Sequence, residues 1–128
     1  MIDEYIKGWL DKADKDLKAV EHELSFPQEE ILRDIVCFHC QQAVEKYLKG
    51  FLIYHKTEFL RTHDIKYLLE KCAIIDKDFA YLEIKELSSF AVEVRYPDDL
   101  YIPDMGEVNF YYELTKRIKE LVLTKLRI

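Results

Sequence analysis

Apolar residues recur at alternating steps of four and three positions through the first part of this chain, from Ile6 to Leu24. This spacing places them on one face of a helix, and Lys and Asp fill the opposite face. The 128 residues include only three glycines and three prolines, which leaves few positions for the tight turns of a β-rich protein. We therefore expect helices joined by short connections.

Capping residues mark the ends of several predicted helices. Asp3 is a candidate N-cap for the first helix, and Asp104 with Glu107 three positions later has capping-box spacing for the last. Pro27 is predicted in the first turn of a central helix that runs from Gln28 to about Tyr54. The short connection at Pro27 predicts that the first two helices are antiparallel neighbours.

Two more helices are predicted between the central helix and the last. The stretch Thr62-His63-Asp64 offers capping side chains for a short third helix that reaches Cys72. Asp76 is expected to open a fourth helix, which ends near Arg95 because Pro97 disfavours helical geometry at the residue before it. The predicted fold is all-α, an up-and-down bundle of four long helices plus one short helix in a single domain over residues 1–128.

Composition restricts the class of protein further. The apolar fraction of 49% is too high for a disordered chain, and the length allows a core without disulfides. The net charge of −6 gives no overall attraction to nucleic acid or anionic lipid, so an RNA site has to be a local basic patch. No segment has the pattern of an export leader or of a membrane-spanning helix, so we expect a cytoplasmic protein.

Cys37, His39 and Cys40 are spaced so that one helical turn could present them as metal ligands. No second paired cluster accompanies them, so we interpret them as core packing, with reduced cysteines, and predict no metal. Arg33 precedes His39 by six positions, or about 600° of helical rotation, which points the two side chains to different faces. We interpret that pairing as chance.

The segment that begins at Arg95 carries the clearest indication of a binding site. Pro97 forces the chain out of the predicted helix, so the arginine is held at the exit with Tyr96 beside it. A guanidinium there can bind a phosphate, and the tyrosine ring can stack on a base. The alternative, which residue chemistry alone favours, is that Arg95 complements the helix dipole and pairs with Asp98 or Asp99.

Other polar and aromatic residues also have two interpretations. Lys46 and Lys49, with Glu45, are predicted to mark the solvated face of the central helix. His63 either belongs to the start of the third helix or contacts an anion and carries a proton. The nine tyrosines favour core or interface packing over base stacking.

Three motifs of this chain, in order, resemble those of HEPN domains, a family of small prokaryotic helical bundles. They are the stretch 41–49 with the sequence QQAVEKYLK, then His63-Asp64-Ile65, then Arg95-Tyr96-Pro97-Asp98. The resemblance covers essentially the whole chain. It implies a bundle of four or five helices that forms a homodimer and is often encoded beside a small nucleotidyltransferase, its partner.

The resemblance also implies where a ligand binds. Other branches of the family are metal-independent RNases of toxin–antitoxin and defence systems, which pair an arginine with a histidine a few residues later. After Arg95 the corresponding positions are Leu100, Tyr101 and Ile102, and no histidine follows. The branch with Arg-Tyr-Pro instead implies contacts to a nucleotide such as ATP, and no other cofactor. The matching positions are Arg95, Tyr96, Asp98, His63, Gln42 and Lys46.

These observations support three hypotheses. In the first, the protein is an interaction module with no or weak catalytic activity that dimerises, binds nucleotide or RNA phosphate near Arg95 and pairs with a nucleotidyltransferase in a toxin–antitoxin-like module. In the second, it is a metal-independent endoribonuclease that uses Arg95 and His63, which requires both side chains in one cleft. In the third, it is a structural dimer without a ligand, which a buried or salt-bridged Arg95 would favour.

Overall fold

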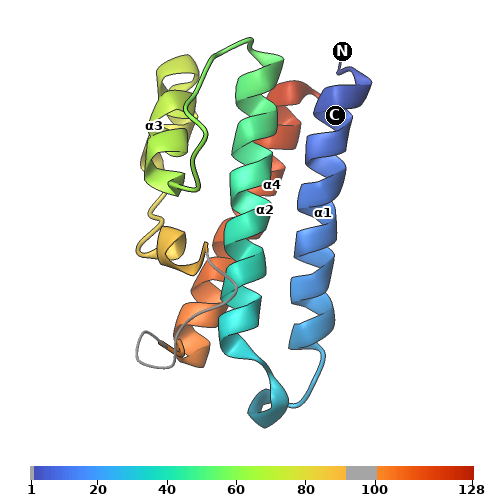
Figure 1. Ribbon diagram of the computed structural model, residues 1–128, viewed down its shortest axis with the longest axis vertical. Helices are drawn as coiled ribbons and strands as arrows, with labels where there is room; N and C mark the ends of the chain where they lie inside the picture. The colour runs from blue at the N-terminus through green and yellow to red at the C-terminus, as the bar shows by residue number, and fades with distance from the viewer. Residues whose placement is uncertain (1, 92–100) are drawn as a thin grey trace.

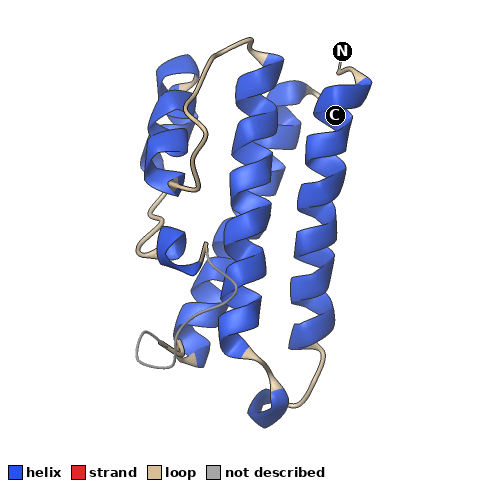
Figure 2. Ribbon diagram, in the orientation of Figure 1, coloured by secondary structure: helices blue, strands red, loops and turns tan. Residues whose placement is uncertain are grey.

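The computed structural model describes residues 2–91 and 101–128, and these residues form helices, turns and loops but no strand (Figures 1 and 2). Three long helices, α1 (Glu4–Leu24), α2 (Arg33–Tyr54) and α4 (Met105–Leu126), run along the molecule. The shorter α3 (Ile65–Ile75) lies beside α2, on the side away from α1. The all-α bundle predicted from the sequence is confirmed.

Helix α2 is the centre of the bundle, because α1, α3 and α4 all pack against it. Its buried residues point in several directions, which explains why its apolar residues form no single stripe. It begins at Arg33 and not at Gln28. Pro27 precedes a short 3₁₀ turn, Gln28–Glu30, and the Leu32 backbone N–H then donates to the Glu23 carboxylate at 3.0 Å, which ties this connection to α1.

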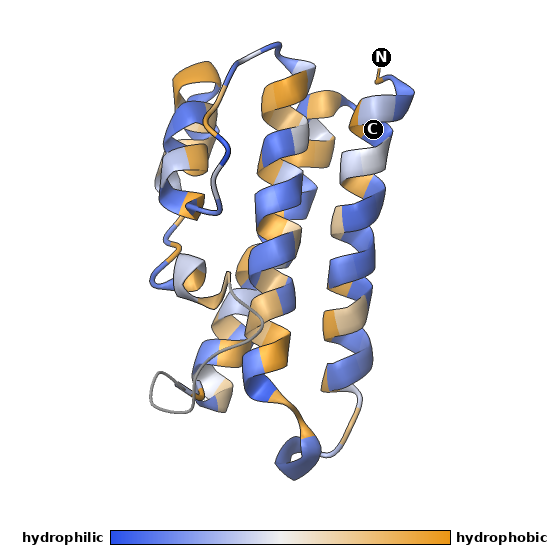
Figure 3. Ribbon diagram, in the orientation of Figure 1, coloured by the Kyte–Doolittle hydropathy of each residue, from blue (hydrophilic) through white to orange (hydrophobic). Residues whose placement is uncertain are grey.

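Three predicted caps are confirmed. The Asp3 carboxylate accepts from the Ile6 backbone N–H at 2.9 Å at the start of α1, and Asp64 caps α3 in the same way. Asp104 and Glu107 form the complete capping box at the start of α4. The apolar side of α1 faces α2, and most of its visible outer surface is hydrophilic (Figure 3).

The prediction of a fourth helix from Asp76 to Arg95 is wrong for the part of that segment that the structure describes. Lys77–Tyr81 and Leu87–Phe90 are short 3₁₀ turns, η2 and η3, and Lys85 between them has a left-handed φ of 46°. Tertiary hydrogen bonds hold this irregular backbone. The Glu86 N–H donates to the Tyr111 hydroxyl at 3.2 Å, for example. Residues 92–100, with Arg95, Tyr96, Pro97 and Asp98, lie outside the described residues.

The three cysteines are free and fully buried, so the prediction that they pack in the core is confirmed. Burial raises the pKa of Cys72 to about 12, and that of Cys40 likewise. Within residues 2–91 and 101–128, no helix combines the length and the apolar character needed to cross a membrane.

Candidate functional site

A buried carboxylate on α2, that of Glu45, lies at the centre of a hydrogen-bonded cluster that reaches the surface. Glu45 is only 5% exposed. Its Oε1 accepts from the Gln41 amide at 3.1 Å and lies 2.8 Å from His63 Nδ1, and its Oε2 accepts from Lys49 Nζ at 2.9 Å. We call Gln41, Gln42, Glu45, Lys49 and His63 the Glu45 cluster.

Helix geometry and one amide position the members of this cluster. Gln41, Glu45 and Lys49 are each four residues apart, so they lie along one face of α2. The amide of Gln41 also donates to the backbone carbonyl of His63 at 3.1 Å, which fixes the loop before α3 against α2. Its carbonyl oxygen accepts from Gln42 at 2.7 Å. Gln41 therefore joins the two predicted site residues His63 and Gln42.

The ionisation of Glu45 decides which nitrogen of His63 carries a proton. Burial raises the pKa of the Glu45 carboxyl, but the hydrogen bonds from His63, Lys49 and Gln41 outweigh burial, and the pKa lies below its ordinary value. Glu45 is therefore a carboxylate at neutral pH and only accepts hydrogen bonds. His63 Nδ1 must then be the donor in the 2.8 Å contact.

The imidazole of His63 is held on one side and open on the other. Its side chain is 68% exposed, and no hydrogen bond to Nε2 occurs within the described part of the chain. A carboxylate that binds one ring nitrogen fixes the tautomer and the orientation of the ring, and so the direction of the other nitrogen. Such a nitrogen can donate to an anion when protonated, or accept a proton when neutral.

A second carboxylate-centred cluster lies beside the first. Asp16 of α1 is 9% exposed, and its two oxygens contact His39 Nδ1 at 2.9 Å and Lys46 Nζ at 2.5 Å. Both partners lie on α2, and Lys46 directly follows Glu45 in the sequence. We call Asp16, His39 and Lys46 the Asp16 cluster. It links α1 to α2, and it engages the ammonium of a residue predicted to contact a ligand.

The prediction that Glu45, Lys46 and Lys49 mark a solvated face is wrong. Glu45 and Lys49 are buried and Lys46 is half-buried. The reason is tertiary: His63 from the loop before α3 covers Glu45, and Trp9 of α1 lies 5.8 Å from Lys49 Nζ, measured to the ring centroid. Oppositely charged residues in a helix that is packed on several sides have to pair in this way.

Sequence reasoning missed several members of these clusters as site residues, namely Asp16, His39, Gln41, Glu45 and Lys49. One signal was present. Glu45 and Lys49 lie four positions apart in a stretch of α2 that is otherwise mostly apolar, which indicates an ion pair. No sequence signal links Asp16 to His39 and Lys46, because their contacts join two helices.

Taken together, the two clusters contain two carboxylates, two ammonium groups and two imidazoles. Their summed charge is zero with neutral histidines and positive once a histidine is protonated. The paired groups of the two clusters therefore add no net negative charge to a chain whose net charge is −6.

The chain enters the 92–100 segment close to the Glu45 cluster. The Ser88 hydroxyl of η3 accepts from the Ile65 backbone N–H at 2.8 Å, and Ile65 follows His63 by two residues. Ala91, three residues after Ser88, is the last described residue before the segment that contains Arg95. The described structure thus brings His63 and Gln42 together and turns Lys46 toward Asp16. The predicted contacts of Arg95, Tyr96 and Asp98 lie outside it.

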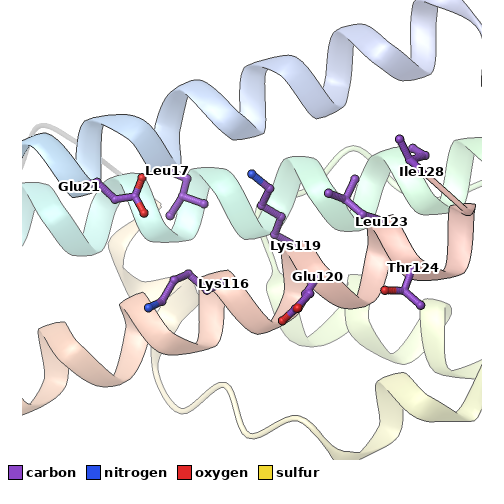
Figure 4. A pocket seen from close by; sticks show the side chains of 8 residues that line it. All are labelled: Leu17, Glu21, Lys116, Lys119, Glu120, Leu123, Thr124 and Ile128. Carbon is purple, nitrogen blue, oxygen red and sulfur yellow. The ribbon is translucent and has the colours of Figure 1, made fainter.

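A groove of about 430 Å³ between α1 and α4 is a weaker candidate (Figure 4). Three of its charged residues are already engaged. Lys119 pairs with Asp14 at 3.2 Å and Lys116 with Glu113 at 3.0 Å, and Glu21 accepts from Tyr112. The groove therefore offers no set of charges that converge on one ligand.

Comparisons with known proteins agree with this architecture. The family model of the HEPN domain matches residues 6–126. The crystal structure of ST0689, an archaeal HEPN homologue, is similar with a TM-score of 0.64 and 22% sequence identity, over 94% of this chain and 96% of that one. At this identity the likeness concerns the fold alone. A comparison with curated proteins gives no match.

Proposed function

The chain belongs to the HEPN family, and we propose that it binds the phosphate of a nucleotide or of RNA at the Glu45 cluster. One observation carries the proposal: the exposed imidazole of His63 is held through Nδ1 by the buried carboxylate of Glu45. Burying a carboxylate beside a surface histidine costs stability. A ligand that binds the open Nε2 would account for this cost, because the carboxylate orients the imidazole toward it.

Four of the five cluster members have a direct role in this proposal. Protonated His63 donates from Nε2 to a phosphate oxygen, while Lys49 neutralises Glu45 so that the carboxylate does not repel the ligand. Gln42 supplies an amide at the partly exposed rim. Arg95 is proposed as a second cation, with Tyr96 as a surface for the base, because the chain enters their segment from η3 beside the start of α3.

The partners expected from the family resemblance also belong to the proposal. The protein is proposed to form a homodimer and to pair with a small nucleotidyltransferase in a toxin–antitoxin-like module, in which ligand binding without catalysis is sufficient. Co-expression with a nucleotidyltransferase encoded beside its gene, followed by size-exclusion chromatography, tests the pairing. Separate elution of the two proteins would contradict it.

Calorimetric titration with ATP and with a short single-stranded RNA tests the binding site. We expect His63→Gln and Arg95→Ala each to weaken binding by about tenfold or more, as expected when a charge-assisted hydrogen bond to phosphate is lost. His22→Gln is the matched control, because His22 is an exposed histidine at the far end of α1. Wild-type affinity in His63→Gln would overturn the proposed site.

The same geometry favours RNA cleavage as a second candidate function. A histidine oriented by a carboxylate can take the proton of a ribose 2′-hydroxyl, whose oxygen then attacks the adjacent phosphorus. The bond to the 5′-oxygen breaks, that oxygen receives a proton, and a 2′,3′-cyclic phosphate results. Gel analysis of the titrated RNA, in the presence of EDTA, separates the two functions. Cleavage lost in His63→Gln supports the RNase, and intact RNA supports a binding module.

A further inference from the structure

Gly8 occupies a position in α1 that the packing of this chain does not explain. It lies in the second turn of the helix, where glycine is less favourable than alanine. It is exposed, and an added Cβ would meet no atom within 4 Å. Gly50 of α2 is different, since a Cβ there would meet the Leu10 side chain at 3.1 Å. Close packing explains Gly50 but not Gly8.

The surface around Gly8 forms a shallow pocket of about 260 Å³ with two aromatic walls. Tyr5 is 64% exposed, and its ring stands edge-on to Trp9 at a centroid distance of 6.4 Å. Glu4, Tyr5, Gly8 and Lys12 are exposed, whereas Trp9 is half-buried at the edge of this surface, with its ring 5.8 Å from Lys49 Nζ of α2. An exposed aromatic beside a glycine suits the close approach of another chain.

The charged residues around this pocket complement those of an identical surface placed antiparallel to it. Glu4 and Lys12 complete its lining, four residues before and four residues after Gly8. Within the described residues, neither side chain forms an ion pair. They are eight residues, or about 12 Å, apart along the helix, too far to pair with each other. A second α1 that crosses antiparallel at Gly8 places each Glu4 beside the Lys12 of the other copy.

We propose that the outer face of α1, formed by Glu4, Tyr5, Gly8, Trp9 and Lys12, is the contact surface for a second copy of this chain. Two-fold symmetry requires the same patch on both protomers, and the positions of Glu4 and Lys12 about Gly8 meet that requirement. Glycine at the crossing lets the two helices approach closely, and Tyr5 of each copy packs in the pocket of the other.

This inference names the surface of the proposed homodimer and rests only on that part of the proposed function. The surface shares no residue with the Glu45 cluster, and the one contact between them among the described residues is that of Trp9 with Lys49, at 5.8 Å from the ring centroid to Nζ. A nucleic acid fits this face less well, since the acidic Glu4 would lie beside its phosphates. Phosphate binding measured by calorimetry and association measured by sedimentation can therefore fail separately.

Charge reversal with complementary mixing tests the contact by analytical ultracentrifugation. Glu4→Lys places four lysines around the proposed crossing, and Lys12→Glu places four glutamates there. We expect each variant alone to dimerise about tenfold more weakly than the wild type. An equimolar mixture should restore association as a heterodimer, because each variant supplies the charge that the other lacks. Lys66→Glu, an exposed reversal on α3, should associate like the wild type.

Gly8→Ala provides a second test, because it should stabilise the folded monomer and weaken the dimer. In dilute solution we expect a rise in Tm of roughly 3 to 6 °C from the better helix propensity. The dimer should nevertheless weaken, because the new methyl group lies at the crossing. Three results would overturn the proposal: a wild-type monomer at all concentrations, reversal variants that dimerise like the wild type, or a mixture that stays as weak as its components.

Discussion

The Glu45 and Asp16 clusters are built from the same three groups, a carboxylate, a lysine and a histidine bound through Nδ1, yet they differ in how they present the histidine. The His63 side chain is 68% exposed, whereas His39 is 28% exposed. Glu45 accepts a further hydrogen bond from Gln41, and its lysine is itself buried. The Asp16 cluster joins two helices, and the Glu45 cluster additionally presents an imidazole to solvent.

This difference has a physical cause. His39 and Lys46 both belong to α2, so Asp16 reaches them across a continuous helix–helix contact. His63 precedes α3, where a loop replaces a packed helix, and one face of its ring stays open. Similar charged groups therefore serve packing where two helices meet and leave the histidine exposed to solvent where a loop begins.

Removal of the two lysines should produce the largest contrast between the clusters. We expect Lys49→Met to lower the free energy of unfolding by about 3–5 kcal/mol, because it leaves the buried Glu45 carboxylate without the ammonium group that pairs with it. Lys46→Met should cost about 1 kcal/mol, since Asp16 keeps His39 and has a side chain that is 12% exposed. Urea denaturation followed by circular dichroism at pH 7 measures both. Equal losses would contradict the distinction.

Acid should affect the Glu45 cluster through one carboxyl group. The folded pKa of Glu45 is lowered from 4.5, so its stabilising contribution is present above that pH and is lost as the pH falls through the folded value. Between pH 5.5 and pH 3, the wild type should therefore lose more stability than Glu45→Gln, which carries no titrating group there. Parallel stability curves for the two proteins would show that Glu45 does not contribute in this way.

The smallest expected effect concerns which ring nitrogen of His63 carries the proton. At pH 8 we expect His63 in the tautomer with hydrogen on Nδ1, and we expect Glu45→Gln to shift it toward a mixture of both tautomers, with His39 as an internal reference. Nitrogen chemical shifts of the imidazole rings report this by NMR. An unchanged His63 signal in Glu45→Gln would mean that the carboxylate does not orient the ring.

Sequence reasoning succeeded where the signal is local. Asp3, Asp64 and the Asp104–Glu107 box cap the predicted helices, because a capping side chain contacts backbone two or three residues away. It failed between Asp76 and Ala91, where a helical period of apolar residues corresponds to two 3₁₀ turns. There Ser88 and Glu86 bond to α3 and α4, which no local pattern reveals.

For the candidate site, too, some residues were predicted from the sequence and others were not. His63 and Gln42 were predicted from the family motifs, and both lie in the Glu45 cluster through Gln41. Lys46 was also predicted, but its ammonium is bound to Asp16. The central role of Glu45 was not predicted, since a Glu and a Lys four residues apart are equally suited to an exposed helix face.

The sequence by itself determined that the chain forms helices, where most of them begin and to which family it belongs, because apolar spacing, capping groups and short motifs act over a few residues. Only the tertiary structure decided which charges are buried. The burial of Glu45 and Lys49 depends on what covers α2, namely Trp9 from one helix and His63 from a loop. These neighbours are distant in sequence, and they meet only when the bundle has formed.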